Sequence, residues 1–321
     1  MNSLAPIILF TYNRPVHTQR TIEHLQKNRF AGESDLTVFS DAPRNKQAEA
    51  DVLATRTFLK TITGFRSLKI IEREKNFGLA ANIIDGVTET VNKFGKVIVL
   101  EDDLDTSPYF LKYMNDTLTM YENEEKVISV HGYTQPVDEK LPETFFLINP
   151  GCWGWATWKR GWNLFNPDAK ELLKQIKSKK LSYRFNLHNA YPFTDLLERQ
   201  VWGDSSSWAI RWYASAFLNE KLTLYAGRSL VVQSGYETGI HYDGKPKWAE
   251  KETYSPTPIN VGKIKITENE TALRAIEEFY RATTPGMAHR LAVRWLRRMK
   301  IYNSVRNIKK KIFKNTPDKK A

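Results

Sequence analysis

The chain has 321 residues, 41% of them hydrophobic, and a net charge of +12. A chain of this length and composition can bury one large core or two smaller ones, which excludes an intrinsically disordered protein. Twelve of the 48 Lys and Arg residues but only one acid lie in residues 286–321, so this segment carries +11 of the net charge. The rest of the chain is nearly neutral, and nucleic acid is therefore not an expected partner of the main domain.

Cys152 is the only cysteine, so no disulfide can form within the chain. A lone cysteine fits a reducing compartment, and the first residues lack the basic and apolar pattern of a signal peptide. No apolar run approaches the length of a membrane-spanning helix. We therefore expect a cytoplasmic protein, with attachment to the inner face of a membrane as an open alternative raised by the basic C-terminus.

Apolar runs alternate with helical patterns through the first hundred residues. The predicted strands are residues 6–10, 36–39, 68–71 and 97–100, and the predicted helices are residues 15–28, 47–60 and 79–93. Continuous apolar runs are typical of strands that are buried on both faces, as in a parallel sheet. Repeated strand–helix units predict a mixed, mainly parallel α/β sheet flanked by helices, with ligands beyond the carboxyl ends of the strands.

The second half of the chain is less regular. Helices are predicted at residues 107–123, with Ser107 as the N-cap, and at 169–178 and 206–218. Residues 152–162 are rich in tryptophan, and residues 235–247 have the glycine and polar content of a mobile loop. We expect one domain over residues 1–285, with a nucleotide-binding half at 1–105 and an acceptor half at 106–285, followed by a tail at 286–321.

The tail has an apolar residue every three or four positions. These residues are Leu291, Trp295, Met299, Tyr302, Val305, Ile308 and Ile312. An apolar stripe among many Lys and Arg residues predicts a basic amphipathic helix. Such a helix can lie on an anionic membrane surface or pack on the protein's own domain, and the sequence leaves both alternatives open.

The acidic triplet Glu101-Asp102-Asp103 follows the fourth predicted strand directly. Three acids at the end of a buried strand are costly unless a cation lies beside them. A divalent metal held by carboxylates and by substrate phosphates meets this need, whereas the simpler alternative is a solvated turn. Polar residues also end the other three strands, and we expect residues 11–14, 40–41, 72–74 and 101–103 to gather at one edge of the sheet.

Four motifs occur in a fixed order: the Tyr12-Asn13-Arg14-Pro15 segment, Ser40-Asp41, the segment from Asn76 to Asn82, and the acidic triplet. This order of motifs resembles that of the glycosyltransferases of the GT-A fold. The similarity is greatest to the family-2-type and N-acetylglucosaminyltransferase I-type enzymes, and it extends over residues 5–245. It implies an Mn²⁺- or Mg²⁺-dependent transferase that moves a hexosyl or N-acetylhexosaminyl group from a UDP- or GDP-linked donor to a saccharide.

The resemblance also implies a role for each matching residue. Arg14 and Asp41 match positions that contact the base and ribose, and Asn82 matches a polar position near the base. Asp103 matches the direct metal ligand, and Glu101 and Asp102 match residues that face the donor sugar and ribose. Asp204 matches the catalytic base of the inverting members, so a carboxylate there would take the acceptor hydroxyl proton.

Each of these residues also has a purely structural interpretation. Asp41 can form a turn, Arg14 can be a surface residue, and Asp204 can be the N-cap of the helix that follows it. The tryptophans of residues 152–162 can be core, although one or two could line an acceptor site. His241 could reach the diphosphate or the metal, or have no role.

Two other functions remain as alternatives to glycosyl transfer. A nucleotidyltransferase that makes nucleotide-sugars shares the sheet architecture, but it needs a glycine-rich loop after the first strand, and residues 11–15 contain no glycine. A dinucleotide-dependent oxidoreductase is disfavoured for the same reason. A non-catalytic adaptor for sugars or membranes would not need the acidic triplet. If the tail lies on a membrane, the acceptor could be a lipid-linked saccharide of cell-surface polysaccharide assembly.

Overall fold

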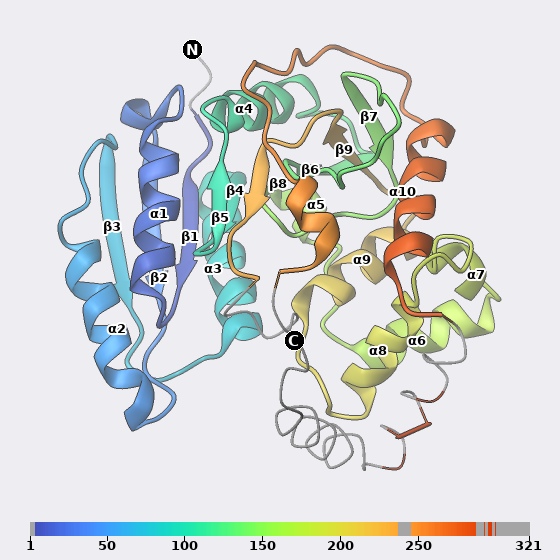
Figure 1. The fold of residues 1–321 in the computed structure, drawn as a ribbon, viewed down its shortest axis with the longest axis horizontal. Coiled ribbons are helices and arrows are strands. Elements are labelled where there is room, and N and C mark those ends of the chain that lie inside the picture. The colour runs from blue at the N-terminus through green and yellow to red at the C-terminus, as the bar shows by residue number, and fades with distance from the viewer. Residues whose placement is uncertain (1–3, 237–244, 287–291, 293–294, 297–298, 300–321) are drawn as a thin grey trace, which may run out of the picture.

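The computed structural model describes residues 4–236, 245–286, 292, 295–296 and 299 (Figure 1). The first hundred residues form three strand–helix units and a fourth strand. In chain order these are β1 (Ile7–Thr11), α1 (Pro15–Gln26), β2 (Asp35–Ser40), α2 (Lys46–Leu59), β3 (Ser67–Glu72), α3 (Leu79–Phe94) and β4 (Lys96–Glu101). Every strand and helix predicted for this half is confirmed, with ends that differ by one or two residues.

Within the described residues, eight strands form one sheet in the order β3-β2-β1-β4-β8-β6-β9-β7. The strands of the second half are β6 (Val127–His131), β7 (Thr144–Leu147), β8 (Trp155–Trp158) and β9 (Leu222–Ala226). The first four strands of the order pair in parallel, and β6 pairs in parallel with β9. Only β8 and β7 run the other way, so the predicted mixed, mainly parallel α/β architecture is confirmed.

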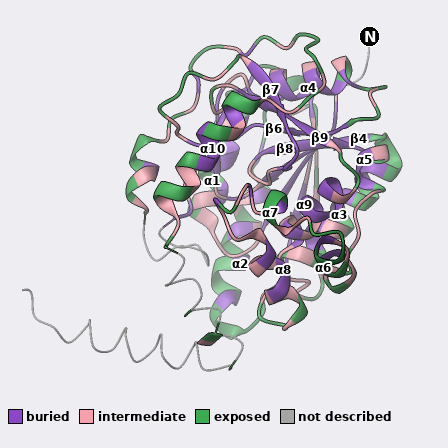
Figure 2. Ribbon diagram, turned by 90° about the vertical axis from the view of Figure 1, so that its right-hand side faces the viewer, coloured by how far each residue is buried: buried purple, intermediate pink, exposed green. Residues whose placement is uncertain are grey.

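Both faces of this sheet are covered. On β1, Ile7 and Leu9 join one buried cluster, and Ile8 and Phe10 join another. The first cluster includes residues of α1, α2 and α4 (Phe110–Met120), whereas the second includes residues of α3 and α9 (Trp208–Leu218). Figure 2 shows the sheet in the buried colour and green on the outer sides of the helices. The continuous apolar runs are therefore explained by helices on both faces.

A short second sheet joins the two halves of the chain. Its strands are β5 (Leu104–Thr106) and β10 (Val231–Gln233), which pair antiparallel. Because β5 starts immediately after the acidic triplet, this pairing brings the start of the 235–247 segment beside the end of β4. Neither strand is long enough to produce a clear pattern in the sequence.

The remaining helices lie in the second half of the chain. They are α5 (Lys159–Trp162), α6 (Ala169–Ser178), α7 (Ser182–Phe185), α8 (Phe193–Val201), α9 and α10 (Glu270–Thr283), with single 3₁₀ turns at Ala31–Glu33 and Lys247–Lys251. The helix predicted to start after Ser107 begins instead at Phe110, and its N-cap position is Tyr109. Ser107 lies two residues before this position, where its hydroxyl accepts from the Tyr109 backbone N–H at 3.3 Å and donates to the carbonyl oxygen of Ser255 at 2.7 Å.

Most of the tryptophan-rich stretch is core. Trp155, Trp158 and Trp162 are at most 4% exposed. Trp155 stacks on Trp208 at the start of α9, with ring centroids 5.1 Å apart, while the Trp158 indole donates to the Leu118 carbonyl on the opposite face of the sheet. Trp153 differs from these three because it is only partly buried.

The predicted tail helix lies mostly outside the described residues. Within it, Ala292, Trp295 and Leu296 are helical, and Trp295 and Met299 are 59% and 55% exposed. Among the residues that the structure describes, no helix is long and apolar enough to cross a membrane.

Candidate active site

The strand ends meet at one edge of the sheet, as their order predicts. Because β1 lies between β2 and β4, Thr11 pairs with Ser40, and Phe10 pairs with Glu101. The backbone N–H of Tyr12 donates to Asp102 Oδ2 at 3.2 Å, and its phenol oxygen accepts from the Arg44 backbone N–H at 3.0 Å. Tyr12 thus connects the acidic triplet to the loop that follows β2.

Arg14 is the cation beside the acidic triplet. Its guanidinium donates to Asp103 Oδ2 at 2.8 Å and lies 3.9 Å from Asp102 Oδ1. Burial raises the pKa of Glu101 well above its usual range, and the charges of Asp103 and Asp102 raise it further. Burial and the Asp103 charge raise the pKa of Asp102 to about 7, against the opposing effect of Arg14. One guanidinium therefore does not neutralise three clustered acids.

The base of the glycine-rich segment packs on this cluster. The backbone N–H of Ser234 donates to the Asp103 carbonyl at 2.8 Å. At the next position a Cβ on Gly235 would lie 2.4 Å from Asp103 Oδ2 and 2.8 Å from Asp103 Cβ. Any side chain at Gly235 would therefore displace the Asp103 carboxylate. Gly235, the first residue of the predicted loop, therefore packs directly on the site. His241 lies outside the described residues.

The triplet fits a divalent cation. Its carboxylates supply the hard oxygen ligands that Mn²⁺ and Mg²⁺ prefer, and its excess negative charge is the complement that such a cation needs. The Asp103 side chain is 14% exposed, so it reaches the surface of the site. Over the described part of the chain, no group of three or more His, Cys, Asp or Glu side chains is arranged as a complete metal site.

Asp41 holds the loop that starts α3. Its Oδ1 accepts from the backbone N–H groups of Ala42 and Phe77, both at 2.9 Å. Its Oδ2 accepts from the Gly78 N–H at 2.9 Å and from the Asn76 side-chain amide at 3.1 Å. These four donors occupy the lone-pair positions of the carboxylate. In this structure Asp41 therefore positions residues 76–78, and a ribose or base would have to replace one donor to contact it directly.

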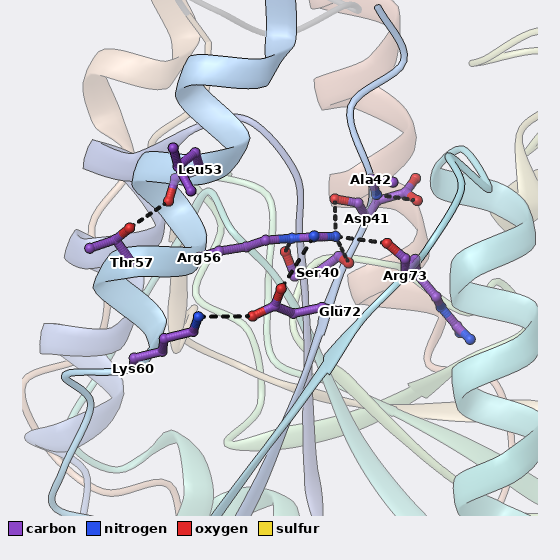
Figure 3. Close-up of polar contacts among 9 residues, drawn as sticks. All are labelled: Ser40, Asp41, Ala42, Leu53, Arg56, Thr57, Lys60, Glu72 and Arg73. Atoms are coloured by element: carbon purple, nitrogen blue, oxygen red, sulfur yellow. Dashed lines mark hydrogen bonds and ion pairs between the residues drawn. The ribbon is translucent and has the colours of Figure 1, made fainter.

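Arg56 of α2 ties together the ends of β2 and β3 (Figure 3). Its guanidinium donates to the carbonyl oxygens of Arg73 at 2.8 Å and of Ser40 and Asp41 at 3.4 Å, and it pairs with Glu72 at 3.3 Å. Arg56 thus fixes the backbone at Asp41, whose carboxylate points to the loop at residues 76–78.

Asn82 is buried on the first turn of α3. Its Oδ1 accepts from Arg73 Nε at 3.0 Å, and the Arg73 guanidinium also lies 4.4 Å from the centre of the Phe77 ring. At 2% exposure, Asn82 offers little surface to a base. The partly buried Phe77 is the more accessible residue of this group.

Asp204 lies in the turn between α8 and α9. Its side chain is exposed, and its backbone N–H donates to the Arg199 carbonyl at 2.9 Å. Asp204 is not the N-cap of α9, because that position is Ser207. The stacking of Trp208 on Trp155 holds the start of α9 against β8, which pairs with β4. The capping interpretation is therefore wrong, and the carboxylate carries no structural bond among the described contacts.

The loop before β8 forms another side of the site. Burial and the charges of Glu101 and Asp103 raise the pKa of the Cys152 thiol well above its usual range. Trp155 of β8 pairs with Val99 of β4, two residues before Glu101, so this loop lies beside the triplet. A Cβ on Gly151 would lie 1.9 Å from the His131 ring, and the Trp153 backbone N–H donates to His131 Nε2 at 3.3 Å. Burial lowers the pKa of His131 to about 3, which keeps the ring neutral and able to accept this bond.

Sequence reasoning missed His131, Tyr133 and Glu252. The run Val127–Val130 followed by His131-Gly132-Tyr133 is a strand with polar residues at its carboxyl end, which is the signal that located the triplet. Glu252 had no signal, because its partners Tyr133 and Tyr236 are distant in sequence.

Comparisons with known proteins give likenesses of fold. No family model matches the chain, and no curated protein matches its sequence. Among solved structures it is similar to the mannosyltransferase PcManGT from Pyrobaculum calidifontis in complex with GDP-Man and Mn²⁺, with a TM-score of 0.39, 12% identity, and coverage of 67% of this chain and 69% of that one. It is also similar to S. aureus TarS, with a TM-score of 0.38, 13% identity, and coverage of 70% of this chain and 36% of that one.

Asp41→Asn tests the positioning role of Asp41. The new amide places donors where the carboxylate accepts from N–H groups, so at least one bond to residues 76–78 is lost. We expect a loss of unfolding free energy of about 1–3 kcal/mol. Chemical denaturation measures it, and Asp51→Asn, at an exposed position of α2, is the matched control. Equal stability of Asp41→Asn and wild type would contradict this role.

Proposed function

We propose that this chain is a metal-dependent glycosyltransferase that moves a sugar from a nucleoside-diphosphate sugar to a saccharide, with inversion at the transferred carbon. The observation that carries this proposal is the acidic triplet with Arg14 at the carboxyl end of β4, beside the loop that Asp41 organises. A metal–diphosphate group and a nucleoside need these two neighbouring features. Both likenesses of fold agree with this class but carry no part of the argument.

In this proposal Asp103 would hold Mn²⁺ or Mg²⁺. The cation would supply Lewis-acid stabilisation of the negative charge on the leaving group. Arg14 fixes the Asp103 carboxylate and adds positive charge to the same region. Glu101 and Asp102 face the donor sugar and ribose. Residues 76–82, which end at Asn82 and are held by Asp41, line the nucleoside.

Asp204 is the proposed general base. The acceptor hydroxyl oxygen forms a bond to the anomeric carbon while the bond from that carbon to the diphosphate oxygen breaks. The hydroxyl proton passes to the Asp204 carboxylate, and the nucleoside diphosphate leaves with the bonding electron pair. An exposed carboxylate with no structural bond of its own is free to serve in this step.

The finer assignments rest on the resemblance of the sequence motifs and on the basic tail. The donor is a UDP- or GDP-linked hexose or N-acetylhexosamine, and the pathway is cell-surface glycan synthesis. A nucleotidyltransferase would need a glycine-rich loop after β1, which residues 11–15 lack. A non-catalytic adaptor would bind a nucleotide-sugar without turning it over, so donor hydrolysis separates it from an enzyme.

A thermal-shift screen of UDP- and GDP-sugars with and without Mn²⁺ tests the donor site. A bound donor at a hundred times its dissociation constant raises the free energy of unfolding by about 2.7 kcal/mol. We expect the Mn²⁺-dependent part of this shift in wild type and not in Asp103→Ala. Asp138→Ala, at a side chain that is 92% exposed, should behave like wild type. An Asp103→Ala protein that retains the Mn²⁺-dependent shift would remove Asp103 from the metal site.

Asp204→Asn separates catalysis from binding. The amide keeps the size of the side chain but does not accept the proton, so we expect transfer to fall about 100-fold or more with donor affinity unchanged. Turnover and donor affinity are measured on the same protein, with Glu220→Gln, at another exposed acid, as the control. If affinity falls while turnover of bound donor does not, Asp204 belongs to the donor site instead.

We also propose that the basic tail lies on an anionic membrane surface and brings a lipid-linked acceptor to the site. Two members of its apolar stripe, Trp295 and Met299, are more than half exposed, and residues 286–321 carry +11. An exposed apolar stripe beside many cations favours the interface of an anionic bilayer.

Vesicle co-sedimentation tests the tail. Each basic residue near an anionic surface contributes about 1 kcal/mol, and salt screens this attraction. We therefore expect binding to anionic vesicles that weakens with salt and is lost when residues 287–321 are removed, while donor hydrolysis remains. Equal sedimentation with neutral and anionic vesicles would favour a tail packed on the domain.

A further inference from the structure

Tyr133, Trp153, Tyr236 and Glu252 form a compact group, which we call the Trp153 cluster. The Trp153 ring centroid lies 4.6 Å from that of Tyr133 and 6.4 Å from that of Tyr236, and both tyrosine rings are nearly perpendicular to the indole. Both phenols donate to Glu252 Oε1, at 2.6 Å from Tyr133 and 2.8 Å from Tyr236. One carboxylate oxygen thus fixes the two rings that frame the indole.

The Trp153 cluster adjoins the acidic triplet through two short connections. Tyr236 directly follows Gly235, whose backbone packs on the Asp103 carboxylate. Trp153 lies two residues before Trp155, which pairs with Val99 of β4, and Val99 lies two residues before Glu101. The cluster is therefore joined to the proposed metal site through two separate segments.

One oxygen of the Glu252 carboxylate lacks a hydrogen-bond donor. Its second oxygen, Oε2, is buried and has no hydrogen-bond donor among the described residues. Burial raises the pKa of Glu252, although the two phenols and Lys245 oppose this effect. Buried acceptors almost always have a donor, so an acceptor without one calls for an explanation. A ligand hydroxyl would supply the donor.

The indole of Trp153 packs against the core but is not enclosed by it. Trp155, Trp158 and Trp162 are fully enclosed, but Trp153 retains exposed surface although it is held on both sides. Gly151 and His131 fix the backbone at Trp153, so the fold sets the position of the indole. A rigid, partly exposed aromatic ring beside a carboxylate suits a pyranose, which has apolar C–H faces and a rim of hydroxyl groups.

We infer that the Trp153 cluster is the acceptor subsite and that it binds a neutral, hydroxyl-rich pyranose, stacked on Trp153 and hydrogen-bonded to Glu252. This inference rests on the proposed glycosyltransferase function, because it assigns the acceptor of that reaction. Tyr133 and Tyr236 are positioning residues, since they hold the carboxylate and frame the indole. A saccharide with its own carboxylate would place two negative charges together and is disfavoured.

Saturation-transfer NMR on the full chain tests this inference without requiring turnover. The probes are the methyl glycosides of glucose, galactose, mannose and N-acetylglucosamine, added with Mn²⁺ and UDP or GDP. We expect at least one glycoside to bind wild type. Its affinity for Trp153→Ala and for Glu252→Gln should be at least about tenfold lower, since the loss of a hydrogen bond to a charged group has that magnitude. Trp153→Phe, which keeps an aromatic face, should restore part of the affinity.

Two controls keep the outcomes separate. Glu250→Gln removes an exposed acid two residues away and should leave saccharide binding unchanged. Binding of Mn²⁺ with UDP or GDP should be retained by every variant, which also shows that each one is folded. If no glycoside binds wild type, or if binding is unchanged in Trp153→Ala and Glu252→Gln, this inference is overturned while the donor site stands. Failure of wild type to bind either nucleotide would overturn the proposed function as well.

Discussion

Electrostatic repulsion at the buried end of β4 is the constraint on which the site depends. Burial and the charge of Asp103 raise the pKa of Glu101 and of Asp102, the charge of Asp102 raises the pKa of Glu101 further, and Arg14 offsets only part of these effects. A folded chain retains such an arrangement at a cost in stability. Much of the surrounding structure exists to hold it: the Tyr12 N–H bonds to Asp102, and β10 pairs with β5 so that Gly235 packs on Asp103.

The two sides of the site are built by different physical means. Around Asp41, charged groups hold the backbone: the Asp41 carboxylate fixes the loop at residues 76–78, and Arg56 fixes the carbonyl of Arg73. Around Trp153, aromatic packing and small residues have this role, since Gly151 lets the chain lie directly on the His131 ring. The segment around Asp41 is thus held by charged hydrogen bonds, whereas the segment around Trp153 is held by packing.

Sequence reasoning succeeded where the chain order matches the spatial order. The first four strands are continuous apolar runs separated by helices, and polar residues at their ends predicted that residues 11–14 and the triplet gather at one edge of the sheet. The second half could not be read in this way, because β8 inserts between β4 and β6 and runs against both. The four donors on Asp41 and the pairing of Glu252 with Tyr133 depend on contacts that no local pattern encodes.

In the proposed function, two substrates would share one small site. Interactions with a diphosphate and a cation are long-ranged and depend on the total charge, so a bound donor would relieve the repulsion of the triplet before any acceptor contact is made. Stacking and hydrogen bonds at Trp153 and Glu252 act only at contact distance. The Asp103 carboxylate touches both sides, through Arg14 and through Gly235. A ligand that changed the charge at Asp103 would therefore act directly on the segment that leads to Tyr236.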